Sequence, residues 1–206
     1  MKLFLTSYRI PDIDRFKEFI EFTEDMKIAI VPNAKDYYAD RARTFKINTM
    51  IELFTEYGFK NISVLDLNNH ANSKSVDAEL TKHDAIWVSG GNTFCLREAM
   101  KKSGFDQVIQ KHVDTGLLFM GDSAGALIPG PSIEGIEECD EPAFAGEYIT
   151  EGLGIIPEYV LPHVGNPEFD PGLDTARELA KSQGLPIIEI TDDQMILYDN
   201  DSYEIV

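Results

Sequence analysis

Short apolar runs alternate with amphipathic stretches along the chain, and this alternation limits the folds open to it. The run Ile28-Ala29-Ile30-Val31 is apolar at every position, as is typical of a strand covered on both faces. Further runs expected to form strands span residues 3–6, 62–67, 85–88, 117–120, 159–161, 187–190 and 195–198. We expect the last two to form a hairpin across Asp192-Asp193.

The stretches between these runs have the apolar spacing of helices. They lie at residues 12–24, 40–57, 75–82, 93–102, 105–114 and 173–182. Strands alternating with helices predict an α/β fold of three layers, in which a mostly parallel sheet carries helices on both faces. Because the 206 residues contain no internal repeat or linker-like segment, we expect one domain spanning residues 1–206.

Charge and composition exclude several classes of function. The formal net charge is −18, whereas nucleic-acid binding needs clustered Lys and Arg, so we expect no nucleic-acid partner. No apolar stretch approaches the roughly 20 residues of a membrane span, and the start of the chain lacks a signal-peptide cleavage pattern. Two cysteines, Cys95 and Cys139, are too few for a disulfide framework. We therefore expect a cytoplasmic protein without a membrane partner.

The pentapeptide Gly121-Asp122-Ser123-Ala124-Gly125 follows the apolar run Leu117-Leu118-Phe119-Met120. Small residues on both sides of a serine let the backbone turn sharply from a strand into a helix. Such a nucleophile elbow holds the serine hydroxyl exposed at the carboxyl end of the strand. The pattern predicts Ser123 as a nucleophile.

A second strand-glycine-helix junction is Ser89-Gly90-Gly91-Asn92-Thr93, which follows residues 85–88. Its glycines permit a backbone N–H to approach a reacting carbonyl, and the helix N-terminus adds positive potential, as an oxyanion hole requires. The alternative is a tight turn in which Asn92 or Thr93 caps the next helix.

A serine nucleophile needs a base within hydrogen-bonding reach. Of the four histidines, His83 precedes a strand, His112 lies in a helical pattern, and His70 is expected to be a loop residue. His163 follows the run at residues 159–161 and is our candidate base, the alternative being an ordinary hydrogen-bonded loop histidine. Cys95 lies in the first turn of an expected helix, and we interpret it as a small buried residue.

The elbow, the segment Gly90-Gly91-Asn92-Thr93-Phe94 and the segment Leu161-Pro162-His163, in this order, resemble the dipeptidase E family of serine peptidases, to which cyanophycinases are related. The resemblance spans the chain by length and element order. It implies a fold like that of class I glutamine amidotransferases and a Ser-His-acid triad with no metal and no organic cofactor. It leaves monomer and homodimer open.

The resemblance also implies roles for single residues. Ser123 would be the nucleophile and His163 the base, while the amides of Gly91 and Ala124 would form the oxyanion hole. The family's acid lies in the loop after the elbow, which points to Glu138.

Glu137 and Asp140 remain rivals for the role of the acid. They belong to the polar segment at residues 129–154, which is expected to form a loop or lid beside the elbow or else a solvated surface excursion.

The family hydrolyses dipeptides with an N-terminal aspartate, so the resemblance implies a small peptide substrate. Arg177 falls near the place where a basic residue is expected to bind the substrate carboxylate, and Asn92 is a second candidate for substrate binding. The alternative for Arg177 is a solvated helix arginine paired with Glu178 or another neighbour. Asp122 departs from the family, and its negative charge would weaken binding of an acidic substrate.

Two other functions fit the same residues. One is an esterase or amidase acting on small acyl compounds, and the other is a non-catalytic binding protein on the same scaffold.

Overall fold

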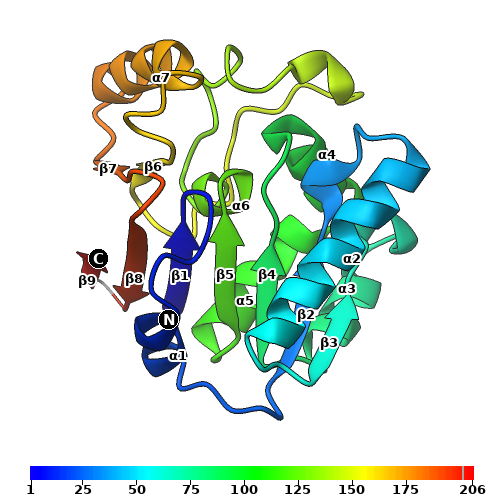
Figure 1. Ribbon diagram of the computed structural model, residues 1–206. Helices are drawn as coiled ribbons and strands as arrows, with labels where there is room; N and C mark the ends of the chain where they lie inside the picture. Colours follow the sequence, from blue (N-terminus) through cyan, green and yellow to red (C-terminus); the bar gives the residue numbers. More distant parts are fainter. Residues whose placement is uncertain (201) are drawn as a thin grey trace.

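A computed structural model describes residues 1–200 and 202–206. At its centre lies a seven-stranded sheet in the order β3-β2-β4-β5-β1-β8-β9 (Figure 1). The strands are β1 (Lys2–Thr6), β2 (Lys27–Val31), β3 (Asn61–Val64), β4 (Ala85–Val88), β5 (Leu118–Asp122), β8 (Met195–Asp199) and β9 (Ser202–Ile205). The first five in chain order pair in parallel, whereas β8 and β9 are antiparallel additions at one edge.

A second sheet contains only β6 (Tyr159–Leu161) and β7 (Ile187–Glu189), which pair in parallel. The expected hairpin between residues 187–190 and 195–198 is therefore wrong. The turn at residues 191–194 carries the chain from the small sheet into the large one, where β8 inserts between β1 and β9. Residues 195–198 are all buried there, because β8 is covered on both faces like the parallel strands.

Helices cover both faces of the main sheet, as the alternating pattern predicts (Figure 1). They are α1 (Ile13–Phe19), α2 (Asp40–Glu56), α3 (Ser73–Leu80), α4 (Thr93–Ser103), α5 (Ile109–Asp114), α6 (Ala124–Leu127) and α7 (Asp170–Ser182). Single 3-10 turns form at η1 (Asn33–Lys35), η2 (Leu67–Asn69), η3 (Phe105–Gln107) and η4 (Pro142–Phe144).

Each face of the sheet has its own apolar core. Side chains of Phe4 and Trp87 pack with Phe16 of α1 and Phe54 of α2. Neighbouring strand residues point the other way, since successive side chains of a strand alternate, and pack with α3, α4, α5, α6 and α7. The observed architecture is thus the three-layer α/β fold that the sequence predicts.

The carboxyl ends of the parallel strands all lie at the upper edge in Figure 1. Residues 129–154 cross above this edge and carry η4, while α7 and the small sheet lie beside them. An isolated bridge between Ser132 and Glu151 closes the base of this excursion.

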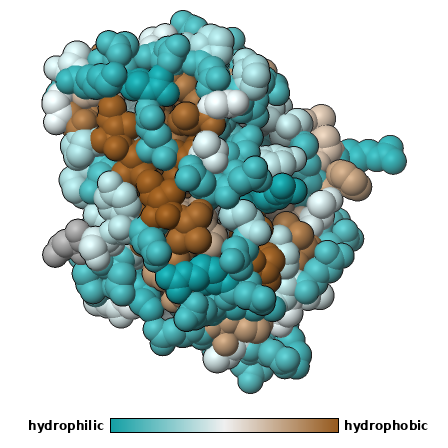
Figure 2. All heavy atoms as spheres, turned by 60° about the vertical axis from the view of Figure 1, so that its left-hand side comes forward, coloured by the Kyte–Doolittle hydropathy of each residue, from teal (hydrophilic) through white to brown (hydrophobic). Residues whose placement is uncertain are grey.

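One side of the sheet ends in the edge strand β9, whose last residue Ile205 is exposed, as is the following Val206. Figure 2 shows this side of the molecule, where apolar residues form an oblique band. Among the described residues, no helix is both long enough and apolar enough to cross a bilayer.

We expect Phe54→Ala to lower the free energy of unfolding by about 3 to 5 kcal/mol, because the change removes a large side chain from a close-packed core. Phe54 is 1% exposed, and its ring lies 4.9 Å from that of Trp87 and 5.5 Å from that of Phe59. Urea denaturation measures the change. Leu53→Ala, at the neighbouring residue that is 40% exposed, is the control, and an equal loss in both variants would contradict this assignment of the core.

Candidate active site

Ser123 lies between β5 and α6, with φ 50° and ψ −112°. Positive φ is unfavourable for a residue with a Cβ, so the surrounding structure must hold this turn. The Ser123 amide donates to the Thr6 carbonyl at 3.0 Å, and the Ser123 carbonyl accepts from the Ala126 amide at 2.8 Å. These bonds fasten the turn to β1 on one side and to α6 on the other.

The glycines of the pentapeptide make room for this turn. A Cβ on Gly125 would lie 1.9 Å from the Val88 carbonyl oxygen, and one on Gly121 would lie 2.3 Å from the Gly125 oxygen. Because contacts so short do not occur, larger residues at either position would push α6 away from β4 and β5. The small residues around Ser123 therefore meet a steric requirement, as expected for a nucleophile elbow.

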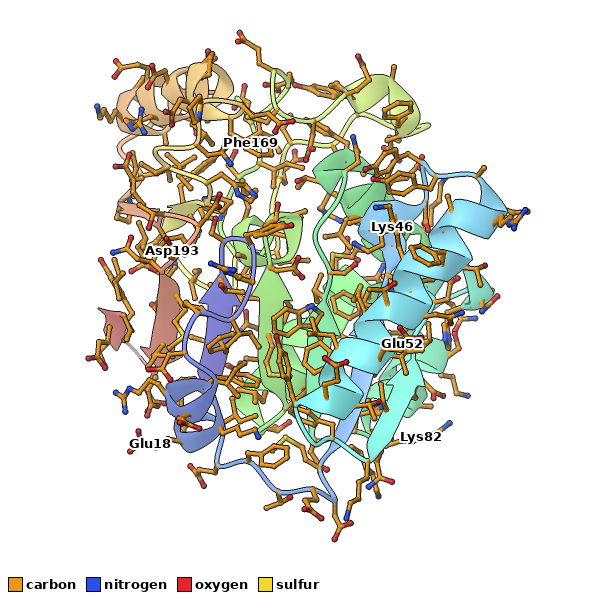
Figure 3. All side chains as sticks on the ribbon, in the orientation of Figure 1. Glu18, Lys46, Glu52, Lys82, Phe169 and Asp193 are labelled. Carbon is orange, nitrogen blue, oxygen red and sulfur yellow. The ribbon has the colours of Figure 1, made fainter. Side chains whose placement is uncertain are left out.

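His163 follows β6 and directs its ring at the nucleophile. Its Nε2 lies 2.9 Å from Ser123 Oγ, and the residue is 6% exposed. The Phe169 ring stacks on the imidazole at a centroid distance of 4.3 Å, and Figure 3 labels Phe169 above the upper ends of the strands. His163 has φ 65°, so its backbone is held in the left-handed region, as is that of Ser123.

Asp192, in the turn between β7 and β8, completes a line of hydrogen bonds. Its Oδ1 lies 2.7 Å from His163 Nδ1, and its Oδ2 accepts from Asn166 Nδ2 at 3.0 Å. When Nδ1 carries the proton that faces Asp192, Nε2 is free to accept the proton of Ser123 Oγ. This is the arrangement of a Ser-His-Asp triad.

Ser7 ties the histidine to the aspartate. Its hydroxyl donates to Asp192 Oδ1 at 2.7 Å and accepts from the His163 backbone amide at 2.7 Å. Burial pushes the pKa of Asp192 upward, but hydrogen bonds from Ser7, Asn166 and His163 outweigh burial and hold this pKa below its usual range. Asp192 is therefore ionised at neutral pH and can orient and stabilise a protonated His163.

The structure places the acids of the 129–154 segment elsewhere. Glu138 is exposed, and its Cβ lies close to Gly172 on α7. Glu137 accepts from the Tyr148 hydroxyl at 2.5 Å. Asp140 accepts from the amide and hydroxyl of Thr93 at 2.8 and 2.6 Å. Asp192 thus occupies the place that the sequence analysis assigned to Glu138.

Gly91 has φ 139°, and a Cβ there would lie 2.3 Å from the Ala34 carbonyl oxygen. Within residues 1–200 and 202–206, the amides of Gly91 and Ala124 donate to no protein acceptor. Gly91 and Ser123 line one cavity, while Ala124 and Ser123 line another. Both amides are therefore available as hydrogen-bond donors on the cavities that border Ser123.

Asn92 is a structural residue in this geometry. Its Oδ1 accepts from the Cys95 amide at 2.9 Å and so caps α4, and its Nδ2 donates to the Glu141 carbonyl at 3.0 Å. The capping alternative considered for this junction is thus observed. Because the side chain is only 3% exposed, it fastens the 129–154 segment to α4 instead of facing substrate.

Two cavities meet at Ser123 and His163. The larger, of about 630 Å³, is polar and open and also contains Lys35, Lys46 and Asp122. The smaller, of about 30 Å³, lies beneath residues 136–140 and is lined mainly by apolar side chains.

Asp122 and Lys35 both line the larger cavity. The Asp122 carboxylate accepts from Trp87 Nε1 at 2.8 Å, and Lys35 Nζ donates to the Gly90 carbonyl at 2.6 Å. Burial raises the pKa of Asp122, which the Lys35 charge partly offsets, and burial lowers the pKa of Lys35. Burial thus disfavours the charged form of each group, and the charge of each partner partly offsets this effect.

Arg177 does not face these cavities in the part of the chain that the structure describes. Its guanidinium pairs with Asp174 on α7 and with Glu189 on β7. The expected role in binding a substrate carboxylate therefore has no support from its position. These contacts match the alternative of a helix arginine paired with acidic neighbours, although Glu178 is not one of the two partners.

The other three histidines form hydrogen bonds away from Ser123. His70 binds Ser75, His83 binds Ser63 and His112 binds Asp77. Cys95 is 5% exposed, and burial raises its pKa to about 11, in line with its interpretation as a buried residue. No group of three His, Cys, Asp or Glu residues within the described ranges is placed to hold a metal ion.

Asp192, Ser7 and Asn166 were missed by the sequence analysis. Asp192 had a usable signal, because it follows the run at residues 187–190 just as His163 follows the run at 159–161. If these two runs pair in parallel, both residues reach the same edge. Ser7 had a similar signal. It directly follows β1, as Ser123 follows β5, and the parallel pairing of these two strands brings both residues to the same edge.

Comparisons with known proteins identify the family of the chain. A family model described as peptidase family S51 matches residues 4–206. An uncharacterised peptidase of Pasteurella multocida is 30% identical, with 98% of this chain and 95% of that protein covered. A cyanophycinase of Geminocystis herdmanii is also 30% identical, with 66% of this chain and 50% of that protein covered.

A solved structure from Listeria monocytogenes EGD-e, described as a candidate peptidase E, matches with a TM-score of 0.84 at 25% identity. The match covers 100% of this chain and 97% of that one. The resemblance to the dipeptidase E family and the α/β fold are thus confirmed. Because the family model covers almost every residue, the chain belongs to peptidase family S51, a family of serine peptidases.

Proposed function

We propose that this peptidase hydrolyses short peptides through the triad Ser123, His163 and Asp192 and a covalent acyl-enzyme. The observation that carries the proposal is the unbroken line of hydrogen bonds at 2.9 and 2.7 Å from Ser123 Oγ through the His163 ring to Asp192. A serine hydroxyl is a weak nucleophile at neutral pH, and such a line supplies both the base and its orientation.

In the first step, His163 Nε2 accepts the proton of Ser123 Oγ as this oxygen bonds to the scissile carbonyl carbon. The carbonyl oxygen becomes an anion, which the Gly91 and Ala124 amides stabilise. His163 then donates its proton to the leaving amine, the C–N bond breaks, and an ester to Ser123 remains. Asp192 stays ionised throughout and stabilises the protonated ring.

In the second step, water attacks the ester carbonyl while His163 takes one of its protons. His163 returns this proton to Ser123 Oγ as the C–O bond breaks, which frees the acid product and restores the enzyme. These steps use only side chains and amides of this chain.

The segment above the site favours small substrates. Asp140 and Glu141 are fastened to Thr93 and Asn92 at the start of α4, and residues 129–154 cross above the carboxyl ends of the strands (Figure 1). A folded protein chain would collide with this cover, whereas a peptide of a few residues fits the open cavity of about 630 Å³. The preference for an N-terminal aspartate, implied by the resemblance, stays a prediction, as does a cytoplasmic location.

We expect Ser123→Ala to lower kcat/KM for every accepted peptide by at least about 1,000-fold, because no other group forms the acyl-enzyme. Release of free amine from a panel of dipeptides measures the loss, with circular dichroism as the check on folding. A fluorophosphonate probe should label the wild type and not the variant. Full hydrolysis by the variant would refute the assignment of the nucleophile.

Asp192→Asn should lower kcat by about 1,000- to 10,000-fold, because an amide can hold the imidazole in the wrong tautomer and cannot stabilise its charge. Glu138→Gln is the matched control and should keep activity within about twofold, since Glu138 is exposed. The same dipeptide assay compares them. A larger loss of kcat in Glu138→Gln than in Asp192→Asn would instead indicate that the catalytic acid lies in the 129–154 segment.

Ser7→Ala should lower kcat by about 10-fold and leave KM unchanged, because Ser7 holds His163 and Asp192 without reaching substrate. The loss of one buried hydrogen-bonding group corresponds to about 1 to 2 kcal/mol. Steady-state kinetics give the two constants separately. An equal change in KM and kcat, or no change in either, would rule out this positioning role.

A further inference from the structure

Lys35 binds the loop that carries one of the proposed oxyanion-hole amides. It lies in η1, just after β2, and its side chain is half-buried. Its Nζ donates to the Gly90 carbonyl oxygen at 2.6 Å. Within residues 1–200 and 202–206, no other donor binds this carbonyl. The contact is a single charge-assisted hydrogen bond, which is stronger than a bond between neutral groups.

This hydrogen bond acts on the amide at the other end of the same peptide group. The Gly90 carbonyl and the Gly91 N–H share one planar peptide, and none of the described peptide bonds is cis. In a trans peptide, the C=O and N–H bonds point in opposite directions. Because Lys35 holds the oxygen, the Gly91 N–H must point away from Lys35. A donor at the oxygen also polarises the peptide and makes its N–H a stronger donor.

The two glycines leave this peptide free to rotate unless a contact holds it. Neither residue has a side chain, and Gly91 has φ 139°, a conformation that glycine adopts readily. On one side, the Ser89 amide donates to the Val31 carbonyl at 3.0 Å. On the other side, the Asn92 amide donates to the Ala34 carbonyl at 2.7 Å. Between these fixed points, the peptide could turn its oxygen into the cavity, where the oxygen would repel an oxyanion.

The loop packs directly against the nucleophile. A Cβ on Gly90 would lie 2.9 Å from Ser123 Cβ and 2.7 Å from Asp122 Oδ2. Gly91 and Ser123 border the same cavity, of about 630 Å³. The direction of the Gly91 N–H therefore matters beside the atom at which the reaction begins.

Asp122 favours the charged form of Lys35 and binds the same loop. Burial lowers the pKa of Lys35, and the charge of Asp122 opposes this effect. Burial raises the pKa of Asp122, while the charge of Lys35 and hydrogen bonds from the Gly90 amide and the Trp87 indole act in the other direction. Lys35 thus binds the carbonyl of Gly90, and Asp122 binds its amide.

We infer that Lys35 is a positioning residue for the oxyanion hole. Its ammonium group holds the Gly90-Gly91 peptide in the orientation that leaves the Gly91 N–H free to bind the oxyanion of each tetrahedral intermediate. The inference rests on the proposed function, in which this amide is one of two donors, and adds the side chain that orients the donor.

Lys35→Met keeps the length of the side chain and removes its charge and its N–H donors. We expect kcat to fall by about 10- to 100-fold, less than for loss of a whole donor, because the Ala124 amide still binds the oxyanion. KM should stay within about threefold of the wild type, since the change affects the tetrahedral state and not the bound peptide. Steady-state kinetics with the dipeptide panel measure both constants. A raised KM with kcat intact would overturn the inference.

Two further substitutions separate the hydrogen bond from packing. Lys35→Arg keeps a cationic donor and should restore kcat to within about fivefold of the wild type, whereas Lys35→Gln, with a neutral donor, should be intermediate. Lys35→Gln also replaces Lys35→Met if circular dichroism shows that the latter unfolds. Equal losses of kcat in all the folded variants would assign Lys35 to packing and overturn the inference.

Lys17→Met is the matched control on α1. Lys17 is also half-buried, and its ammonium group lies 4.9 Å from the centroid of the Phe22 ring, outside both cavities at Ser123. This variant should leave kcat unchanged, because no contact connects Lys17 to the loop at Gly90. A loss of kcat as large as in Lys35→Met would show that removal of any such lysine slows the enzyme, and would overturn the inference.

Lys46, labelled on α2 in Figure 3, tests whether positive charge in the cavity is sufficient. It borders the same cavity, but its Nζ lies over the Tyr38 ring at 4.7 Å. We expect Lys46→Met to lower kcat at least about fivefold less than Lys35→Met does, because Lys46 does not bind the loop. Equal losses of kcat in these two variants would overturn the inference.

The rate of labelling by a fluorophosphonate probe tests the oxyanion hole without a peptide. Ser123 Oγ bonds to phosphorus while His163 takes its proton and fluoride leaves, and the phosphoryl oxygen takes the place of the oxyanion. We expect Lys35→Met to be labelled at least about 10-fold more slowly than the wild type.

The probe also distinguishes failure of this inference from failure of the proposed function. Equal labelling rates in the wild type and Lys35→Met would overturn the inference and leave the proposed function standing. Slower labelling of the variant, with no dipeptide hydrolysed by the wild type, would keep the inference and reject the peptide substrate. A wild type that the probe does not label would overturn both.

Discussion

The hydrogen bonds of Ser7 join the parts of the molecule that make up the site. Ser7 follows β1, an interior strand of the main sheet, whereas His163 and Asp192 follow the two strands of the small sheet. One hydroxyl binds the His163 backbone and the Asp192 side chain at 2.7 Å each. This buried contact links the end of β1 in the main sheet to the two loops that carry His163 and Asp192.

The nucleophile itself is positioned by sterics. Ser123 keeps an unfavourable positive φ because strands β1 and β5 and helix α6 leave no other path for the chain. The glycines at 121 and 125 allow the backbones to approach within distances that no Cβ would permit. Because the strain is held by a close-packed core, the hydroxyl needs little further ordering when substrate binds.

The acidic side chains near this nucleophile have hydrogen-bond donors within the protein. The chain has a net charge of −18, yet Asp192, Asp140 and Asp122 each have assigned hydrogen-bond donors. These carboxylates respectively orient a ring, fasten the cover and bind the Trp87 side chain. Arg177 is paired with two carboxylates outside the site.

The sequence by itself determined the features whose causes are local. The alternation of apolar runs and amphipathic stretches predicted the layered α/β fold, because burial on two faces requires side chains that are apolar throughout a strand. The glycines around Ser123 predicted the elbow, because the turn is steric and involves only neighbouring residues. His163 was identified by its place after a strand, and the structure puts it 2.9 Å from the nucleophile.

Only the tertiary structure decided which residues meet at that edge. Asp192 lies 29 residues beyond His163, and Ser7 lies 156 residues before it, so no local pattern relates them. Their contacts follow from the pairing of β6 with β7 and of β1 with β8, which the expected hairpin misassigned. The orientation of Arg177 and the size of the small pocket likewise depend on how α7 packs against residues 135–139, because side-chain direction and free volume are set by long-range contacts.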